Sequence, residues 1–214
     1  MKTRRPSFDH EKKFWDKNLK ILGIDEVGRG SFAGPLIGAA VSFDNNLKKL
    51  KKKKLKQIND SKLLTHKKRK ALAKFIQTNS EYLIETVDIE TIDRIGIGKS
   101  NSLLFRRLIK KAQNRQKNLR FLIDGRRNLK GKNAEFIIKG DRESISIAAA
   151  SIIAKVIRDR IMVEYDRCYP GYGFARHKGY GTPEHFTALR TLGPCPIHRR
   201  SFRMPSPIPG ESLD

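Results

Sequence analysis

The segment "LGIDEVGRGSFAGPL", Leu22–Leu36, carries an apolar run into two adjacent acids, Asp25 and Glu26, and then into a glycine-rich turn. Two short apolar runs flank this turn, Leu19–Val27 before it and Leu36–Phe43 after it. A turn between two such runs is typical of a β-hairpin. We therefore expect the first two strands of the fold to be antiparallel.

The two adjacent acids raise a geometric problem. Neighbouring residues on a regular strand point to opposite faces, so Asp25 and Glu26 reach one site only where the chain departs from a flat strand. Gly28 and Gly30 supply the conformational freedom for that departure. We expect a bulge or a strand end at Val27 that turns Glu26 toward the site.

The chain carries a large excess of positive charge. Lysine and arginine number 46 against 22 acids, which gives a net charge of +24 at pH 7 over 214 residues, and 38% of the residues are hydrophobic. This composition suffices for one domain with a real core. A polyanionic partner would offset the self-repulsion of the charge; nucleic acid is the commonest one, and a membrane surface is the alternative.

Targeting and redox features predict a cytoplasmic protein. No apolar run is long enough to span a bilayer, and the N-terminal "MKTRRPSFDHEKKFW" lacks the apolar centre of a secretory signal. Cys168 and Cys195 form no Cys-x-x-Cys pair, which favours two reduced thiols over a disulfide.

Composition divides the chain into a polar, basic segment (residues 1–18), a main domain (19–200) and a loose, proline-rich tail (201–214). The sequence leaves open whether the tail binds a partner such as a polymerase clamp. The lysine-rich block Leu47–Lys56 is either a solvated loop or a phosphate-contacting arm, and charge runs of this kind are usually solvated.

Helical and strand-like patterns alternate through the main domain. Thr65 is a good N-cap for a helix in which Leu72, Phe75 and Ile76 share one face. The longest helix pattern begins near Ser146, is rich in alanine and ends at "YPGYG". Further helices are expected over Ser100–Gln113 and Pro183–Leu192, and further strands over "EYLIETVDI", "LRFLIDG" and "AEFIIKGD".

Acidic residues end three predicted strands: Asp25 with Glu26, Asp124 in "FLIDG" and Asp141 in "IIKGD". Singly, each aspartate fits an ordinary turn. Together they form an oxygen-ligand set of the kind that Mg²⁺ or Mn²⁺ prefers, because buried carboxylates need a partner and no histidine or cysteine cluster stands beside them. On a basic protein this set predicts phosphoryl chemistry, in which two divalent ions activate a water and stabilise the leaving oxygen.

Seven blocks cover nearly the whole chain: "GIDEVGRGSFAGPL", "DSKLL", "FLIDG", "IIKGD", "SIAAASIIAKVIRDRIM", "GYGFARHKGYGTPEH" and "HRRSF". In this order the blocks resemble the type 2 ribonucleases H, and specifically bacterial ribonuclease HII. Val27, Ser31 and Phe32 stand where members of that family often carry Ala, Pro and Leu, and these changes keep the turn.

The resemblance implies an α/β ribonuclease H-like fold, with a central five-stranded mixed sheet flanked by helices and a small helical C-terminal portion. It implies metal-dependent hydrolysis of the RNA strand of RNA/DNA hybrids, and incision 5′ to single ribonucleotides embedded in duplex DNA. The products would carry 3′-hydroxyl and 5′-phosphate ends. The cofactors would be Mn²⁺ or Mg²⁺ in a two-metal mechanism.

The resemblance also assigns residues. Asp25 and Glu26 match the family's first two acidic ligands, and Asp124 and Asp141 match the third and fourth. The three residues Gly28, Arg29 and Gly30 match a ribose-reading turn, which is reasonable because glycines let the backbone approach a 2′-hydroxyl. Arg29 could meet the adjacent phosphate, Lys62 in "DSK" resembles a phosphate contact, and Tyr180 matches a tyrosine that stacks on the sugar after the ribonucleotide.

Other interpretations are weaker. His177, His185 and His198 could be taken for a metal cluster, but we expect structural histidines and assign them no ligand role. A ribonuclease HIII-like enzyme would carry an extra N-terminal domain, for which the residues before Asp25 are too few. A non-catalytic basic nucleic-acid-binding protein would account for the charge but not for the acids. We expect a monomer.

Overall fold

The computed structural model describes residues 5–15, 17, 19–45, 52–126 and 133–203. The first half of the lysine-rich block Leu47–Lys56 lies outside the described residues, and its second half contains the short helix α3 (Lys52–Leu55). Of the predicted tail, only residues 201–203 are described.

A mixed five-stranded sheet forms the centre of the fold. β2 is antiparallel to β1 and to β3, whereas β4 runs parallel to β1 and β5 runs parallel to β4. The expected hairpin and the expected sheet are confirmed. The strands are β1 (Lys20–Val27), β2 (Leu36–Ser42), β3 (Glu81–Val87), β4 (Leu119–Asp124) and β5 (Ala134–Ile137), in the spatial order β3-β2-β1-β4-β5.

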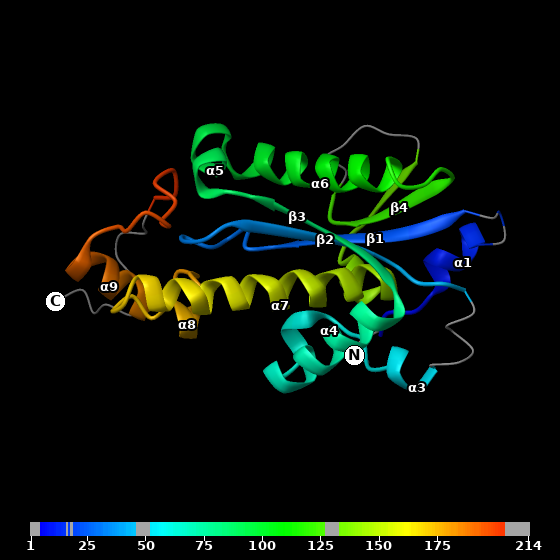
Figure 1. The fold of residues 1–214 in the computed structure, drawn as a ribbon, viewed down its shortest axis with the longest axis horizontal. Coiled ribbons are helices and arrows are strands. Elements are labelled where there is room, and N and C mark those ends of the chain that lie inside the picture. The colour runs from blue at the N-terminus through cyan, green and yellow to red at the C-terminus, as the bar shows by residue number, and fades with distance from the viewer. Residues whose placement is uncertain (1–4, 16, 18, 46–51, 127–132, 204–214) are drawn as a thin grey trace.

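Helices cover both faces of the sheet (Figure 1). On one face lie α5 (Ile89–Ile95) and α6 (Ile97–Gln113); on the other lie α4 (His66–Asn79) and α7 (Ile145–Cys168). As predicted, α4 begins after Thr65, whose side chain accepts a hydrogen bond from the backbone of Lys68. The core is therefore split into two layers, one above the sheet and one below.

The long helix α7 lies very close to β1. Its first turns bury Ala148, Ala149 and Ala150 completely, and these small side chains allow a short distance between helix and sheet. Gly23 of β1 completes the fit, because a Cβ at this position would overlap the backbone of Ser146. This contact holds β1 firmly against α7.

The described part of the segment before β1 packs against the domain. It contains α1 (Asp9–Trp15), an element that the sequence patterns did not predict. Glu11 of α1 is fully buried, and its carboxylate accepts hydrogen bonds from the Ser144 hydroxyl at 2.6 Å and the Ser146 amide at 3.0 Å. The helix is thereby joined to the N-terminus of α7.

Two predicted strands end earlier than expected. The strand predicted over "EYLIETVDI" ends at Val87, because the Asp88 side chain accepts a hydrogen bond from the Thr91 amide at 2.7 Å and begins α5. The strand predicted over "AEFIIKGD" ends at Ile137, and left-handed Lys139 turns the chain into the 3₁₀ helix η2 (Gly140–Arg142). Asp141 therefore lies on a helical turn after β5 and not on the strand.

A small helical portion extends beyond α7, as expected. It contains α8 (Phe174–His177) and α9 (Pro183–Leu192), and α9 has the predicted limits. Both helices lie at one end of the sheet, beside the C-terminal half of α7 (Figure 1). None of the helices among the described residues has the length and apolar character needed to cross a membrane.

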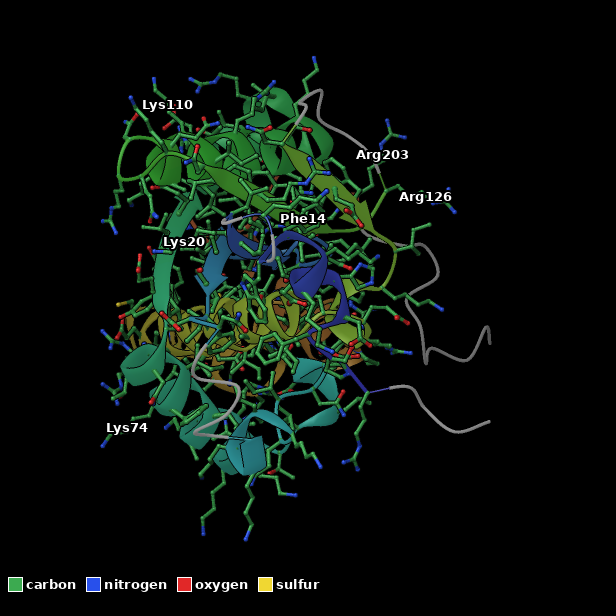
Figure 2. The ribbon with its side chains drawn as sticks, turned by 90° about the vertical axis from the view of Figure 1, so that its right-hand side faces the viewer. Phe14, Lys20, Lys74, Lys110, Arg126 and Arg203 are labelled. Carbon is green, nitrogen blue, oxygen red and sulfur yellow. The ribbon has the colours of Figure 1, made fainter. Side chains whose placement is uncertain are left out.

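Exposed basic side chains surround the molecule. Figure 2 shows Lys74, Lys110 and Arg126 extending away from different elements of the fold. The positive charge is therefore spread over several faces. Such a distribution suits contact with a long polyanion more than recognition of one small anion.

Candidate active site

One cavity of about 510 Å³ collects every residue that the sequence patterns and the resemblance assigned to the site. It opens where the carboxyl ends of the parallel strands β1 and β4 lie side by side. Ser61, Ser151 and Lys155 line it as well, and no motif argument had singled them out. The assigned residues that line it are Asp25, Glu26, Gly28, Arg29, Gly30, Lys62, Asp124, Asp141 and Tyr180.

The end of β1 presents two neighbouring carboxylates to this cavity. The pairing of β1 with β4 stops at Ile24, while the pairing with β2 continues without interruption to Val27. The predicted strand end at Val27 is thus present, and there is no bulge between these two strands. Beyond Ile24 one edge of β1 is open, and Asp25 and Glu26 both line the cavity there.

Local hydrogen bonds orient the aspartates. The Asp25 carboxylate accepts a hydrogen bond from the Glu26 amide at 2.7 Å. Asp124 ends β4, and its carboxylate accepts a hydrogen bond from the Gly140 amide at 2.6 Å. The second bond joins the end of β4 to η2 and so brings Asp141 to the same cavity.

Burial and mutual repulsion disfavour the ionised form of the two carboxyl groups at the end of β1. Loss of solvent, followed by the charges of Glu26 and Asp124, raises the pKa of Asp25 well above its usual value. Burial and the charge of Asp124 raise the pKa of Glu26 to about 7, while Arg29 and Lys62 act in the opposite direction. The cationic side chains at the cavity therefore offset only part of the charge.

The other two carboxyl groups show the same effect. Burial raises the pKa of Asp124, although its hydrogen bond from the Gly140 amide lowers it. Burial, and then the charges of Asp60 and Asp124, raise the pKa of Asp141 to about 6. A bound divalent cation would offset the mutual repulsion of these four carboxyl groups and favour their ionised form.

The donor set fits a hard divalent cation, although the carboxylates stand apart from one another. Four carboxylates and no sulfur or imidazole ligand suit Mg²⁺ or Mn²⁺. Across the described parts of the chain, no three His, Cys, Asp or Glu side chains are arranged closely around an ion position. Mutual repulsion keeps such groups apart, and a bound cation would remove that repulsion.

The loop before α4 brings Lys62 to the cavity. Asp60 is buried, accepts a hydrogen bond from the Lys62 amide at 2.9 Å and forms an ion pair with Arg142 at 3.2 Å. The Ser61 and Ser151 hydroxyls are 2.7 Å apart and join the same loop to α7. Lys62 is therefore held by its backbone, and its side chain is left to face the cavity.

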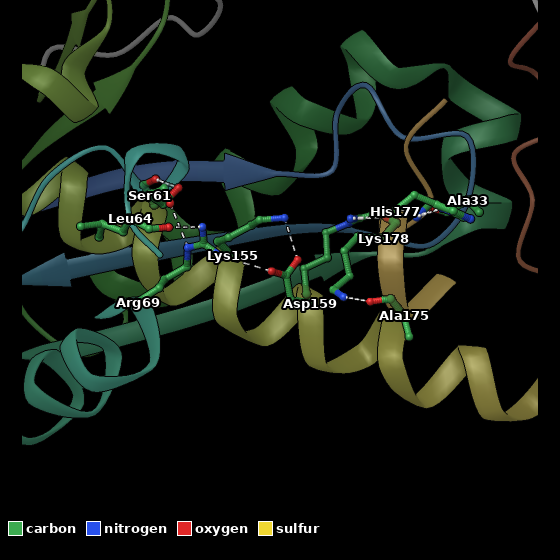
Figure 3. A network of polar contacts seen from close by, with 12 residues as sticks. Ala33, Ser61, Leu64, Arg69, Lys155, Asp159, Ala175, His177 and Lys178 are labelled. Carbon is green, nitrogen blue, oxygen red and sulfur yellow. Dashed lines mark hydrogen bonds and ion pairs between the residues drawn. The ribbon is translucent and has the colours of Figure 1, made fainter. Parts of the chain in front are cut away.

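A network of charged side chains joins α7 to α4 beside the loop of Lys62 (Figure 3). The Lys155 ammonium donates to Asp159 at 2.7 Å, and Arg69 lies 3.5 Å from the other oxygen of the same carboxylate. Arg69 also donates to the carbonyl oxygens of Ser61 and Leu64. Sequence reasoning missed Lys155, although its spacing of four residues from Asp159 on a helix was a visible signal.

The glycine turn and the loop that carries Tyr180 are in direct contact. The Phe32 amide donates to the Gly179 carbonyl at 2.8 Å, and Ser31 forms a β-bridge with Tyr180. The Tyr180 ring centroid lies 5.4 Å from the Lys155 ammonium. Two segments far apart in the sequence (Ser31 and Tyr180 differ by 149 positions) thus form one wall of the cavity.

The histidines form a buried network beyond this wall. The Cys195 amide donates to His198 Nδ1 at 2.9 Å, so the proton of that ring lies on Nε2, which is 3.0 Å from His185 Nε2. His185 Nδ1 in turn lies 2.9 Å from the Tyr180 carbonyl oxygen. Burial lowers the pKa of His185 to about 4. The rings are neutral at neutral pH and support the loop of Tyr180.

Known proteins similar to this chain point to one family. The family model described as Ribonuclease HII matches residues 22–204. Ribonuclease HII of Endomicrobium trichonymphae is 43% identical over 199 residues, which cover 91% of this chain and 91% of that protein. Ribonuclease HII of Chlorobium luteolum is 45% identical over 199 residues, covering 89% of this chain and 91% of the relative.

Solved structures share the fold at lower sequence identity. The ribonuclease HII in a complex with PCNA from Archaeoglobus fulgidus has a TM-score of 0.74 and 24% identity, covering 91% of this chain and 98% of that one. A Bst-RNase HIII in complex with Mn²⁺ has a TM-score of 0.67 and 23% identity, covering 82% of this chain and 63% of that one. The expected ribonuclease H-like architecture is confirmed.

Proposed function

The chain belongs to the ribonuclease HII family, and on this basis we propose that the cavity at the carboxyl ends of β1 and β4 is its active site. The protein is a ribonuclease H-type nuclease. In the proposed site Asp25, Glu26, Asp124 and Asp141 hold divalent ions, Mg²⁺ or Mn²⁺. One observation carries this proposal: four carboxylates from three separate segments line one cavity in a chain of net charge +24.

Two such ions, when bound, supply an activated water and stabilise the oxygen that leaves. The chain's own residues hold the ions, position the phosphodiester and limit access of bulk water. Lys62 and Arg29 lie at the same cavity and suit contact with phosphates that flank the cut. The buried position of Asp25 strengthens its interaction with a cation, because electrostatic forces are stronger away from water.

We propose RNA/DNA hybrids and duplex DNA with a single ribonucleotide as the substrates. The protein, working as a monomer, would cut on the 5′ side of the ribonucleotide and leave 3′-hydroxyl and 5′-phosphate ends. Gly28 and Gly30 let the backbone approach the 2′-hydroxyl that distinguishes RNA from DNA. The ring of Tyr180, across the cavity wall, suits stacking on the neighbouring sugar.

The proposal is tested by Asp124→Asn on a duplex with one ribonucleotide. We expect incision by the unmodified chain with Mg²⁺ or Mn²⁺, no incision without a divalent ion, and a loss of at least about a hundredfold in kcat for the variant. Glu90→Gln is the matched control, because it also removes one negative charge but lies on α5, away from the cavity. End-labelled products give the position of the cut and the chemistry of its ends.

The outcomes separate the parts of the proposal. Full activity of Asp124→Asn with either metal would refute the ligand assignment. A cut on the 3′ side, or one that leaves a 3′-phosphate, would refute the proposed incision and keep the nuclease. Equal loss in Glu90→Gln would show that net charge matters more than the cavity.

A further inference from the structure

Arg158, in the middle of α7, is a fully buried arginine with an unusual set of partners. Its side chain has no exposed surface. Among the described residues no acid forms an ion pair with it, and its nitrogens donate to backbone carbonyl oxygens instead. A buried charge of this kind is costly, so the position calls for a specific explanation.

The three carbonyl groups belong to two different loops. Nη2 donates to Ala33 at 2.8 Å and Nε donates to Pro35 at 3.0 Å, both after the glycine turn. Nη1 donates to Lys178 at 2.9 Å, in the loop that carries Tyr180. One planar guanidinium therefore joins both loops, and its fixed fork geometry is what a lysine could not supply.

The same side chain contacts the residues that face the substrate. Its guanidinium carbon lies 5.4 Å from the centroid of the Tyr180 ring. A Cβ at Gly28 would overlap its Nε, so the glycine turn rests directly on the arginine. Arg158 is not among the residues that line the cavity, which places it behind the wall.

We propose that Arg158 is a positioning residue that fixes the distance between the Gly28–Gly30 turn and Tyr180, and so sharpens the choice of the ribonucleotide junction. The inference rests on the proposed function, because the two loops recognise the junction only if that function holds. Arg158 acts through Tyr180 and the turn; it does not touch the substrate itself.

A second buried arginine provides a matched control. Arg199 donates to the carbonyl oxygens of Gly34, at 2.8 and 3.0 Å, and Arg29, at 3.3 Å. Both partners lie in the loop between β1 and β2, and neither lies in the loop that carries Tyr180. Arg199→Lys therefore disturbs a buried arginine and the glycine turn without releasing the loop of Tyr180.

The test is a double-mutant cycle on incision of a duplex with one ribonucleotide. We expect Arg158→Lys to lower kcat/KM about ten- to hundredfold, while the Kd for an all-DNA duplex in EDTA changes less than about threefold. The factor by which Tyr180→Ala lowers kcat/KM should be at least about fivefold smaller in the Arg158→Lys background than in the unmodified chain, because the arginine acts through the tyrosine. In the Arg199→Lys background, Tyr180→Ala should lower kcat/KM by the same factor as it does in the unmodified chain.

Each outcome decides the inference. Independent effects of Arg158→Lys and Tyr180→Ala, or unchanged junction choice in Arg158→Lys, would overturn it. If Arg158→Lys does not unfold cooperatively, Gly179→Ala tests the same spacing from the loop, because its Cβ would collide with the Ala33 carbonyl. Normal junction choice in that variant would also overturn the inference. If the unmodified chain does not incise the duplex, the proposed function fails and the role of Arg158 in junction choice fails with it. Incision by the unmodified chain, together with independent effects of the two substitutions, overturns the role of Arg158 alone.

Discussion

Gly30 illustrates at the scale of one residue how the fold leaves space for a ligand. Apart from Gly30 and its two chain neighbours, no described residue has an atom within 4 Å of the position that a Cβ would take at Gly30, and its φ is outside the left-handed region. Its neighbour Gly28 differs, because its φ is +94° and a Cβ there would meet Arg158. The protein itself thus requires a glycine at position 28 but not at position 30.

Gly30→Ala is therefore expected to fold normally and to cut poorly. The added methyl group projects into open space at the cavity and blocks close approach of a ribose, which should lower kcat/KM at a single ribonucleotide about ten- to hundredfold. Gly98→Ala is the control, since its Cβ also meets open space but lies on α6, away from the cavity. Thermal unfolding and incision assays test both variants; normal incision by Gly30→Ala would remove the ribose-reading role.

Glu26 gives a prediction for stability without metal. Its pKa rises from 4.5 to about 7 on folding. An acid with a raised pKa in the folded state favours folding only while it is protonated, so its contribution is lost as pH increases from about 4.5 to about 7. In EDTA, the free energy of unfolding should fall between about pH 5 and about pH 8 by on the order of 1 to 3 kcal/mol more in the unmodified chain than in Glu26→Gln.

Urea unfolding of both proteins at the two pH values measures this difference. The comparison with the glutamine variant removes the contribution of Asp141, which titrates in both chains. The difference still includes the interaction of Glu26 with Asp25, because the charge of Glu26 raises the pKa of Asp25. Equal pH dependence in the two proteins would contradict the raised pKa. A saturating divalent ion should reduce the difference, because it stabilises the ionised carboxylate.

At the scale of elements, the sequence predicted those helix ends that are set by a capping residue or a proline. Thr65 and the proline at 183 indicated helix starts, and the structure places both helices there. α1 and α5 were missed because they are short, at seven residues each, and their ends depend on contacts that the sequence pattern does not reveal. Asp88, for example, lies next to an apolar strand and ends it only through its hydrogen bond to Thr91.

The site likewise contains residues that the sequence pattern predicted and residues whose role depends on contacts made only after folding. The acids could be found from the sequence because each follows a recognisable apolar run. Arg158 could not, because its partners are carbonyl oxygens of loops that are distant in the sequence, and a backbone carbonyl has no sequence signature. Lys155 did carry a signal, its spacing of four residues from Asp159, but that spacing indicates an ion pair on a helix and not the contact with Tyr180.

Glu11 tests the importance of the missed helix α1. Its buried carboxylate accepts hydrogen bonds from Ser144 and Ser146 at the start of α7. Glu11→Ala leaves these donors without a partner and should reduce the free energy of unfolding by about 1 to 3 kcal/mol. Glu11→Gln keeps one acceptor and should cost less. Urea unfolding measures both; equal stability of Glu11→Ala and the unmodified chain would mean that α1 contributes little.

At the scale of the whole molecule, the charge separates binding from catalysis. The net charge of +24 is spread over an exposed basic surface, whereas the candidate ligands lie in one cavity (Figure 2). Affinity for a duplex should come from the surface lysines and arginines that displace counterions from phosphates. The cavity carboxylates should add little to affinity and nearly all of the chemistry.

This separation predicts that Asp124→Asn binds a duplex with the salt dependence of the unmodified chain. In EDTA, log Kd should rise linearly with log salt concentration with the same slope in both proteins, since the slope counts phosphate contacts and not metal ligands. A paired change of surface residues, Lys74→Gln with Lys110→Gln, should reduce the slope if those faces contact the duplex. Fluorescence anisotropy over a salt series measures all three chains. A different slope in Asp124→Asn would mean that the cavity contributes to affinity, and the division between binding surface and catalytic cavity would then be wrong.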